Sequence, residues 1–179
     1  MTPGFSGEVA EYYAKYRRGY SRQVLDALQA AWELDTDDVV LDLGCGTGQL
    51  ALPLASRVRS VIGMDPEPDM LRPARESAAR QSEQNVTWVL GSDTDVPTLG
   101  ALVGKGSLAM TVIANAIHCM DYRGLFPALR PLCRAGGGVA VVADGTPLWL
   151  QDTDWSPPRG DVDQRRAKRL PIGTADSYA

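Results

Sequence analysis

The sequence predicts a doubly wound α/β domain, in which a mostly parallel sheet carries helices on both faces. The first observation is a set of short apolar runs, at residues 39–43, 60–65, 86–90, 108–114 and 138–143. They are apolar almost throughout, which is typical of parallel strands buried on both faces. The second observation is that segments with helical spacing of apolar residues lie between several of these runs. The third is a cluster of glycines directly after the first run.

Before the first strand, residues 8–31 are expected to be helical in two segments separated by Gly19. Apolar residues recur at intervals of three and four in both segments. Ser21 is a suitable cap for the second segment, because its side-chain oxygen can accept a hydrogen bond from an unpaired backbone N–H group.

Helical segments are expected between the strands. The helix after strand 39–43 contains Pro53, and the helix at 67–81 contains Pro73. Each proline lacks a backbone donor and is expected to disturb its helix. A further helix is expected at 122–133, before the fifth strand.

The length of 179 residues is that of one domain, which we expect to occupy residues 1–150. The apolar share of 44% and the charged share of 22% are ordinary for a globular protein. Residues 151–179 contain prolines and mixed charges but no apolar run of strand length. They are expected to form an irregular or disordered tail.

Charge and cysteine content restrict the expected partners. The net charge of −4 argues mildly against a nucleic-acid partner, because binding phosphates requires a basic face. The three cysteines lack the spacing of metal ligands or of a disulfide framework, so we expect no metal site and a cytoplasmic protein. No apolar run approaches the roughly 20 residues of a membrane span, so no membrane partner is expected.

The glycines after the first strand indicate a nucleotide-binding loop, because ligands of doubly wound sheets bind at the carboxyl ends of the strands. Gly44, Gly46 and Gly48 allow positive φ and a close approach of the ligand. Gln49 stands where the dinucleotide pattern Gly-x-Gly-x-x-Gly requires glycine. The carboxylate of Asp42 would repel a pyrophosphate but suits a ligand with an ammonium group. The loop therefore favours S-adenosylmethionine over NAD; the alternative is a turn that only joins strand and helix.

Asp65 ends the second strand, 17 residues after Gly48. A carboxylate at this position can accept hydrogen bonds from both hydroxyls of a ribose, as in the dinucleotide-binding folds. The alternative is an N-cap for the next helix. The two roles are compatible.

The chain resembles the class I S-adenosylmethionine-dependent methyltransferases of the small-molecule type, which have a Rossmann-like sheet. The resemblance covers residues 5–150 and rests on four motifs: Val39–Gly48, Val61–Asp65 with Met70 and Leu71, Gly91–Pro97, and Leu129–Leu132 with Gly136–Gly138. Residues Tyr16–Tyr20 also resemble the Tyr-Arg-Pro-Gly-Tyr element of one branch of this family.

The resemblance implies which residues bind the cofactor. The methionyl part would lie against Asp42 and the loop residues Gly44, Cys45, Gly46 and Gly48. The ribose would lie at Asp65 and Pro66.

The resemblance also places the adenine in the loop after the third strand, where the family usually has Gly-Asp-Ala-Glu. This chain has Ser92 at the aspartate position and Asp93 next to it, so either residue is a candidate for the adenine contact. Tyr16 and Arg17 would close over the cofactor, with Arg17 pairing with its carboxylate. The alternative for these two residues is an ordinary exposed helix face.

The loop after the fourth strand begins at Asn115 and, in the family, lies beside the transferred methyl group. His118, the single histidine of the chain, is a candidate general base for a substrate oxygen or nitrogen. The alternative is a histidine that only packs against the cofactor, since methyl transfer can proceed largely by alignment of the acceptor. The loop lacks the Asn-Pro-Pro-Tyr pattern of adenine-N6 methyltransferases, which again disfavours nucleic-acid substrates.

The resemblance implies methyl transfer to an oxygen, nitrogen or carbon atom of a small metabolite. The alternative is a cofactor-binding relative with little or no transferase activity, and an NAD-dependent oxidoreductase is disfavoured by Asp42 and Gln49. Family members usually continue with a helix and a pair of antiparallel strands, which the tail does not show. The C-terminal strands are therefore expected to be missing, and the fifth strand would be an exposed edge and a candidate homodimer surface.

Overall fold

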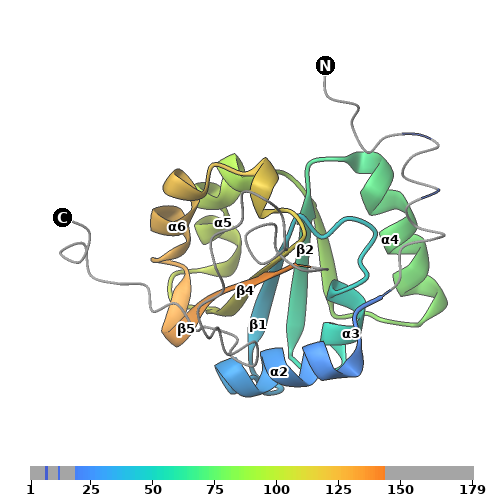
Figure 1. The fold of residues 1–179 in the computed structure, drawn as a ribbon, viewed down its shortest axis with the longest axis horizontal. Helices are drawn as coiled ribbons and strands as arrows, with labels where there is room; N and C mark the ends of the chain where they lie inside the picture. The colour runs from blue at the N-terminus through green and yellow to red at the C-terminus, as the bar shows by residue number, and fades with distance from the viewer. Residues whose placement is uncertain (1–6, 8–11, 13–18, 144–179) are drawn as a thin grey trace, which may run out of the picture.

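The computed structural model describes residues 7, 12 and 19–143 of the chain. Within them, five parallel strands form one sheet in the order β3-β2-β1-β4-β5 (Figure 1). The strands are β1 (Val39–Leu43), β2 (Ser60–Asp65), β3 (Val86–Leu90), β4 (Leu108–Ala114) and β5 (Cys133–Val142). The order reverses between β1 and β4. The predicted doubly wound α/β fold is confirmed.

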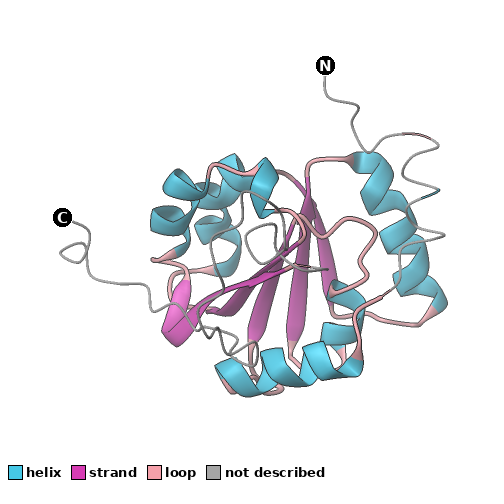
Figure 2. Ribbon diagram, in the orientation of Figure 1, coloured by secondary structure: helices cyan, strands magenta, loops and turns pink. Residues whose placement is uncertain are grey.

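Helices cover both faces of the sheet (Figure 2). They are α2 (Arg22–Trp32), α3 (Ala51–Ala55), α4 (Pro68–Arg80), α5 (Val96–Val103) and α6 (Tyr122–Leu129). The structure places α2 and α3 on one face and α5 and α6 on the other, while α4 packs on β2 and β3 next to α3.

The central strands supply side chains to both apolar layers. Val40, Val61 and Val112 join the cluster under α2 and α3, whereas the residues that follow each of them, Leu41, Ile62 and Ile113, join the cluster under α5 and α6. Alternate residues of a strand point to opposite faces. This double burial explains why the strands are apolar at almost every position.

The bounds of β1 to β4 agree with the predicted runs, and Ser21 caps α2 as predicted. Two differences concern the last elements. Helix α6 ends at Leu129, earlier than predicted, and β5 begins at Cys133, five residues earlier than predicted. Glycines that resemble strand breakers instead permit close pairing here, because a Cβ on Gly137 would lie 2.8 Å from the carbonyl oxygen of Leu108 in β4.

Helix α5, together with the short 3₁₀ turn η1 (Asp93–Asp95) before it, was not predicted. Its eight residues include Pro97 and Gly100, which are weak helix formers, and only Val96 and Leu99 are buried. The predicted helix before residue 19, the boundary at residue 150 and the tail at 151–179 lie outside the described residues.

A partly buried ion pair joins elements at the edge of the sheet opposite the candidate site. The guanidinium of Arg134 in β5 donates to both carboxylate oxygens of Asp38, at 2.8 and 3.0 Å, and to the carbonyl oxygen of Trp32 at 3.2 Å. These contacts join β5, the start of β1 and the end of α2. Among the described residues, no helix is long and apolar enough to cross a membrane.

Candidate cofactor site

The glycine loop lies at the carboxyl edge of the sheet, between β1 and α3. The backbone N–H groups of Gly44 and Cys45 donate to the carbonyl oxygen of Met64 in β2, at 2.8 and 3.0 Å. Gly44 has a φ of +74°, and a Cβ there would lie 2.6 Å from the Cβ of Ala116 in the loop after β4. Two requirements therefore select glycine at this position: a left-handed backbone and the close approach of the next loop.

Asp42 is the most unusual residue of the site. It is 1% exposed, and neither of its carboxylate oxygens has a hydrogen-bond partner. Burial raises its pKa to about 7; the nearby N–H of Ala51 lowers the pKa, and the charge of Asp65 raises it further. A buried charge without a partner is costly, so this carboxylate is suited to a cationic ligand.

Asp65, at the end of β2, anchors the glycine loop. One carboxylate oxygen accepts the N–H of Gly46 at 2.8 Å, and the other accepts the N–H of Glu67 at 3.0 Å. Burial raises the pKa of Asp65, and the two N–H groups partly oppose this shift. Each oxygen has a second lone pair, which leaves the carboxylate able to accept a ribose hydroxyl as well. Glu67 is the N-cap residue of α4, and Pro66 is exposed beside Asp65.

These features fit the methionyl and ribose parts of S-adenosylmethionine. The cofactor carries an ammonium and a sulfonium group, and Asp42 offers a buried carboxylate with unused acceptors at the glycine loop. Asp65 lies next to the same loop, as its bond to Gly46 shows. The fit rests on these acceptors and on the turn of the loop, which requires the left-handed backbone of Gly44 and Gly48, where φ is +74° and +83°.

The two candidate adenine contacts in the loop after β3, Ser92 and Asp93, have different hydrogen-bond partners. The Ser92 hydroxyl lies 2.7 Å from the Thr94 hydroxyl and donates to Asp95 at 3.2 Å, so it caps the 3₁₀ turn. Asp93 accepts the N–H of Asp121 at 2.8 Å and thereby joins the loops after β3 and β4. Each side chain has a structural role, and either one keeps an acceptor for a ligand.

The loop after β4 presents its polar residues at the same edge. Asn115 has a φ of +55°, and its side-chain amide donates to the Tyr20 hydroxyl at 3.0 Å. His118 lies in the 3₁₀ turn η2 (Ile117–Cys119), and it is exposed. The structure thus brings Asn115 next to Tyr20, which precedes α2. The side chain of His118 is exposed to solvent at the same edge of the sheet.

Cys45 is held in the interior of the loop. It is 6% exposed, and its thiol donates to the carbonyl oxygen of Gly46 at 3.7 Å. Burial raises the pKa of the thiol well above its usual value, and the carboxylates of Asp42 and Asp65 raise it further. A protonated, buried thiol is a packing residue rather than a nucleophile.

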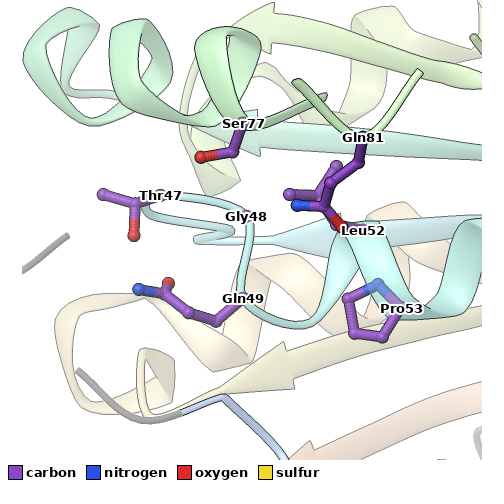
Figure 3. A pocket seen from close by; sticks show the side chains of 7 residues that line it. All are labelled: Thr47, Gly48, Gln49, Leu52, Pro53, Ser77 and Gln81. Carbon is purple, nitrogen blue, oxygen red and sulfur yellow. The ribbon is translucent and has the colours of Figure 1, made fainter. Parts of the chain in front are cut away.

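A cavity of about 200 Å³ lies on the outer side of the glycine loop, between α3 and α4. Figure 3 shows Ser77 of α4 and Gln81, the residue that follows α4, extending toward the loop and α3. Among the residues predicted to bind the cofactor, only Gly48 lines this cavity. The cavity is therefore distinct from the Asp42 and Asp65 side of the loop.

Sequence reasoning missed two residues of this region. Tyr20 contacts Asn115 across 95 positions of the chain, and the Trp88 ring lies against the glycine loop. A signal for Trp88 existed, because Gly63 interrupts an apolar strand and such glycines mark close approach by another group. Tyr16 and Arg17, which were predicted to close over the cofactor, lie outside the described residues.

The model of a family described as a methyltransferase domain matches residues 40–137, more than half of the chain. The match begins in β1 and ends in β5, so it includes the glycine loop, Asp65 and the loops after β3 and β4.

Among curated proteins, the chain is 43% identical over 56 residues to the 23S rRNA (uracil(1939)-C(5))-methyltransferase RlmD of Aliivibrio salmonicida; the match covers 31% of this chain and 13% of that protein. The corresponding protein of Klebsiella pneumoniae is 39% identical over 70 residues, which are 39% of this chain and 16% of the relative. The chain thus spans well under a fifth of these relatives.

Solved structures show the same fold. A protein of Anaeromyxobacter dehalogenans, provisionally described as a type II methyltransferase, has 26% identity and a TM-score of 0.58 over 73% of this chain and 50% of its own. Phosphoethanolamine N-methyltransferase 2 of Haemonchus contortus, solved with S-adenosyl-L-methionine, has 21% identity and a TM-score of 0.63 over 78% of this chain and 33% of its own. At this lower identity the second likeness concerns the fold alone.

The relatives correct the prediction that the partner is a small molecule and that nucleic acid is excluded. The curated relatives are 23S rRNA methyltransferases, so the exclusion of nucleic acid is wrong. It rested on the net charge of −4 and on the missing Asn-Pro-Pro-Tyr pattern, which concerns adenine-N6 enzymes alone. Net charge sums over the whole surface, whereas contacts with phosphates need only a local basic face, so it does not decide the class of acceptor.

The family match spans the elements that build the glycine loop, and the buried acceptors of this loop fit a cationic cofactor. The chain belongs to the methyltransferase domain family and, within it, to the class I enzymes that depend on S-adenosylmethionine.

Proposed function

We propose that the chain transfers the methyl group of S-adenosylmethionine to an oxygen, nitrogen or carbon atom of an acceptor. The observation that carries the proposal is Asp42, a buried carboxylate with both oxygens unpartnered beside the glycine loop. NAD would bring a pyrophosphate to this carboxylate, which would repel it. A ligand with an ammonium group supplies the missing partner.

Each part of the proposed site has a distinct task. Asp42 and the residues Gly44, Cys45, Gly46 and Gly48 hold the methionyl part, and Asp65 with Pro66 holds the ribose. Ser92 and Asp93 lie at the adenine end, and Asn115 lies beside the sulfur. The bound cofactor supplies an electrophilic methyl group on a positively charged sulfur. The chain contributes chiefly by aligning the acceptor with this group, which removes most of the entropic barrier to the reaction.

The acceptor atom must lose the proton that it carried when it gains the methyl group. His118 is exposed at the carboxyl edge and is proposed as the general base that accepts this proton. The alternative role is packing against the bound ligands. A His118→Gln variant distinguishes them: a base predicts a fall in kcat with unchanged cofactor affinity, whereas a packing residue predicts a change in cofactor affinity.

Two acceptor classes have support. A small metabolite is supported by the resemblance of the sequence motifs to methyltransferases of the small-molecule type. A uracil base of RNA is supported by the curated relatives, which are 23S rRNA methyltransferases. Methyl transfer is therefore tested with both small molecules and RNA.

The test has two steps. Titration calorimetry with S-adenosylmethionine and with NAD measures cofactor choice, and the proposal predicts saturable binding of the first alone. Transfer of a labelled methyl group is then measured to a panel of alcohols, amines and small molecules with a nucleophilic carbon and, separately, to ribosomal RNA. Label in one acceptor class identifies the substrate. Binding without transfer to either class would favour a cofactor-binding relative without transferase activity.

A further inference from the structure

The indole of Trp88 packs against the end of the glycine loop, near Ala74 of α4. Trp88 belongs to β3 and stands opposite Gly63 of β2 in the sheet register, and Gly63 stands opposite Asp42 of β1. The ring is partly buried against the apolar cluster under α2 and α3. Indole, glycine and carboxylate therefore form one row across three neighbouring strands.

The ring fills the space that two glycines leave open. A Cβ on Gly63 would lie 2.6 Å from Cε3 and from Cζ3 of Trp88, and a Cβ on Gly48 would lie 2.7 Å from its Cη2. Both separations are too short for real carbon atoms, so neither glycine can be replaced while the ring keeps its position. The outer six-membered ring thus spans the distance from β2 to the last glycine of the loop.

The contact with Trp88 is made at the end of the glycine loop, at Gly48. Gly48 has a φ of +83°, and the chain enters α3 three residues later. Asp65 anchors the middle of the loop through Gly46, and Met64 anchors its beginning. Trp88, with Ala74 of α4 at 3.5 Å from the Cβ position of Gly48, supports its end.

We propose that Trp88 is a positioning residue for the cofactor, one that holds the glycine loop in its binding conformation through Gly48 and Gly63. The inference rests on the proposed function of the site. The loop is packed by the indole on one side and binds the cofactor on the other. A looser loop spends part of its time in other conformations, and apparent affinity falls in proportion to the competent fraction.

The test is a double-mutant cycle on the full chain with S-adenosylhomocysteine as the probe, read by titration calorimetry. Trp88→Leu removes the support and is expected to weaken binding about tenfold, or about 1.4 kcal/mol. Gly63→Ala in the presence of Trp88 displaces the ring toward the loop and is expected to weaken binding by a similar factor. In the Trp88→Leu background the same Gly63→Ala change should have a clearly smaller effect, because the clash with the ring is gone and only the 3.2 Å approach to Cys45 Sγ remains.

Trp32→Leu is the matched control. Trp32 is 3% exposed, and this change likewise removes an indole that packs on the cluster under α2 and α3, but next to Gly138 of β5 and away from the loop. Its melting temperature should fall while its dissociation constant stays within about twofold of wild type. If Trp88→Leu does not fold, Trp88→Phe, which loses the outer ring that reaches Gly48, is used in the same cycle.

The outcomes separate the two proposals. Binding by wild type, with an unchanged dissociation constant for the Trp88 variant, overturns the positioning role alone. So does an equal effect of Gly63→Ala in both backgrounds, or a loss of affinity in Trp32→Leu as large as in Trp88→Leu. A wild-type chain that binds no S-adenosylhomocysteine overturns the proposed function, and the positioning role falls with it.

Discussion

Asp42 is the residue on which the proposed cofactor site chiefly depends. Proteins rarely bury a carboxylate without hydrogen-bond partners, because the charged form loses its hydration without compensation. Here both oxygens are unpartnered, and the carboxylate of Asp65 raises the pKa in addition to burial. Under the proposed function, a cation bound beside Asp42 would offset this cost.

Asp42→Asn tests this arrangement through stability and pH. The folded pKa of about 7 lies above the unfolded value of about 3.9, so the folded chain binds the extra proton between these values. Stability from this group is complete below about pH 4 and is lost as the pH rises through 7. The ligand-free Asn variant should therefore be more stable than wild type at pH 8 by a few kcal/mol, since each pKa unit is worth about 1.4 kcal/mol.

Urea unfolding of both proteins at pH 4, 6 and 8 measures this difference. The advantage of the Asn variant should grow with pH, and its affinity for S-adenosylmethionine should fall. A difference that does not change with pH would show that Asp42 ionises normally in the folded chain.

Asp65→Ala tests the ribose role and the anchoring of Gly46. The loss of a charged hydrogen bond is expected to weaken cofactor binding by roughly 1.5–3 kcal/mol. Calorimetric titration measures it, with Glu76→Ala on the exposed side of α4 as the control for loss of one acidic charge. An unchanged dissociation constant would remove Asp65 from the site.

At the residue scale, local patterns could be predicted from the sequence and long-range contacts could not. Asp42, Asp65 and the glycines form a motif within a few residues of two strand ends, so their common edge follows from the fold class. The contacts of Tyr20 with Asn115 and of Trp88 with Gly48 depend on register and side-chain direction across the sheet. The exclusion of nucleic acid failed because the total charge does not say where charges lie on the surface, and because the missing Asn-Pro-Pro-Tyr pattern concerns adenine-N6 enzymes alone.

At the scale of elements, the strands were the predictable part. Each of β1 to β4 is a short apolar run. Burial on both faces leaves little freedom in the bounds of β1, β2 and β4, whereas the edge strand β3 is only partly buried. Helix α5 was not predicted because Pro97 and Gly100 interrupt its helical pattern. The predicted fifth strand was too short because glycines usually interrupt strands. In β5 the glycines serve the pairing with β4.

The ion pair between Arg134 and Asp38 joins β5, the start of β1 and the end of α2. Its contribution to stability should depend on pH in the opposite sense to that of Asp42. Burial alone would raise the pKa of Asp38, but hydrogen bonds from Arg134 and from the N–H of Asp35 lower it overall. Stability from Asp38 is therefore present above its unfolded pKa and is lost as the pH falls through the folded value.

Arg134→Met leaves Asp38 buried and unpaired. It should cost about 2 kcal/mol at pH 7, less than a fully buried pair, because the arginine side chain is 31% exposed. Denaturant unfolding from pH 7 to pH 3 measures the loss, which should shrink toward acid pH as Asp38 takes up a proton. A loss that is independent of pH would assign the effect to packing rather than to charge.

At the scale of the whole molecule, the strand order brings the functional residues together. The reversal between β1 and β4 places the glycine loop next to the loop after β4, and β2 adds Asp65 from the other side. The proposed cofactor site is thus built from the ends of four strands that are neighbours in the sheet, β3, β2, β1 and β4. The acceptor side depends on chemistry that the shared fold does not specify, since one fold serves many substrates.

The central claim, that this edge of the sheet binds S-adenosylmethionine through Asp42 and Asp65, is tested most directly by a crystal structure of the chain with S-adenosylhomocysteine. The account predicts the ligand ammonium within hydrogen-bond distance of an Asp42 oxygen and the ribose hydroxyls on Asp65. A ligand bound elsewhere, such as in the cavity between α3 and α4, with Asp42 still unpartnered, would contradict it.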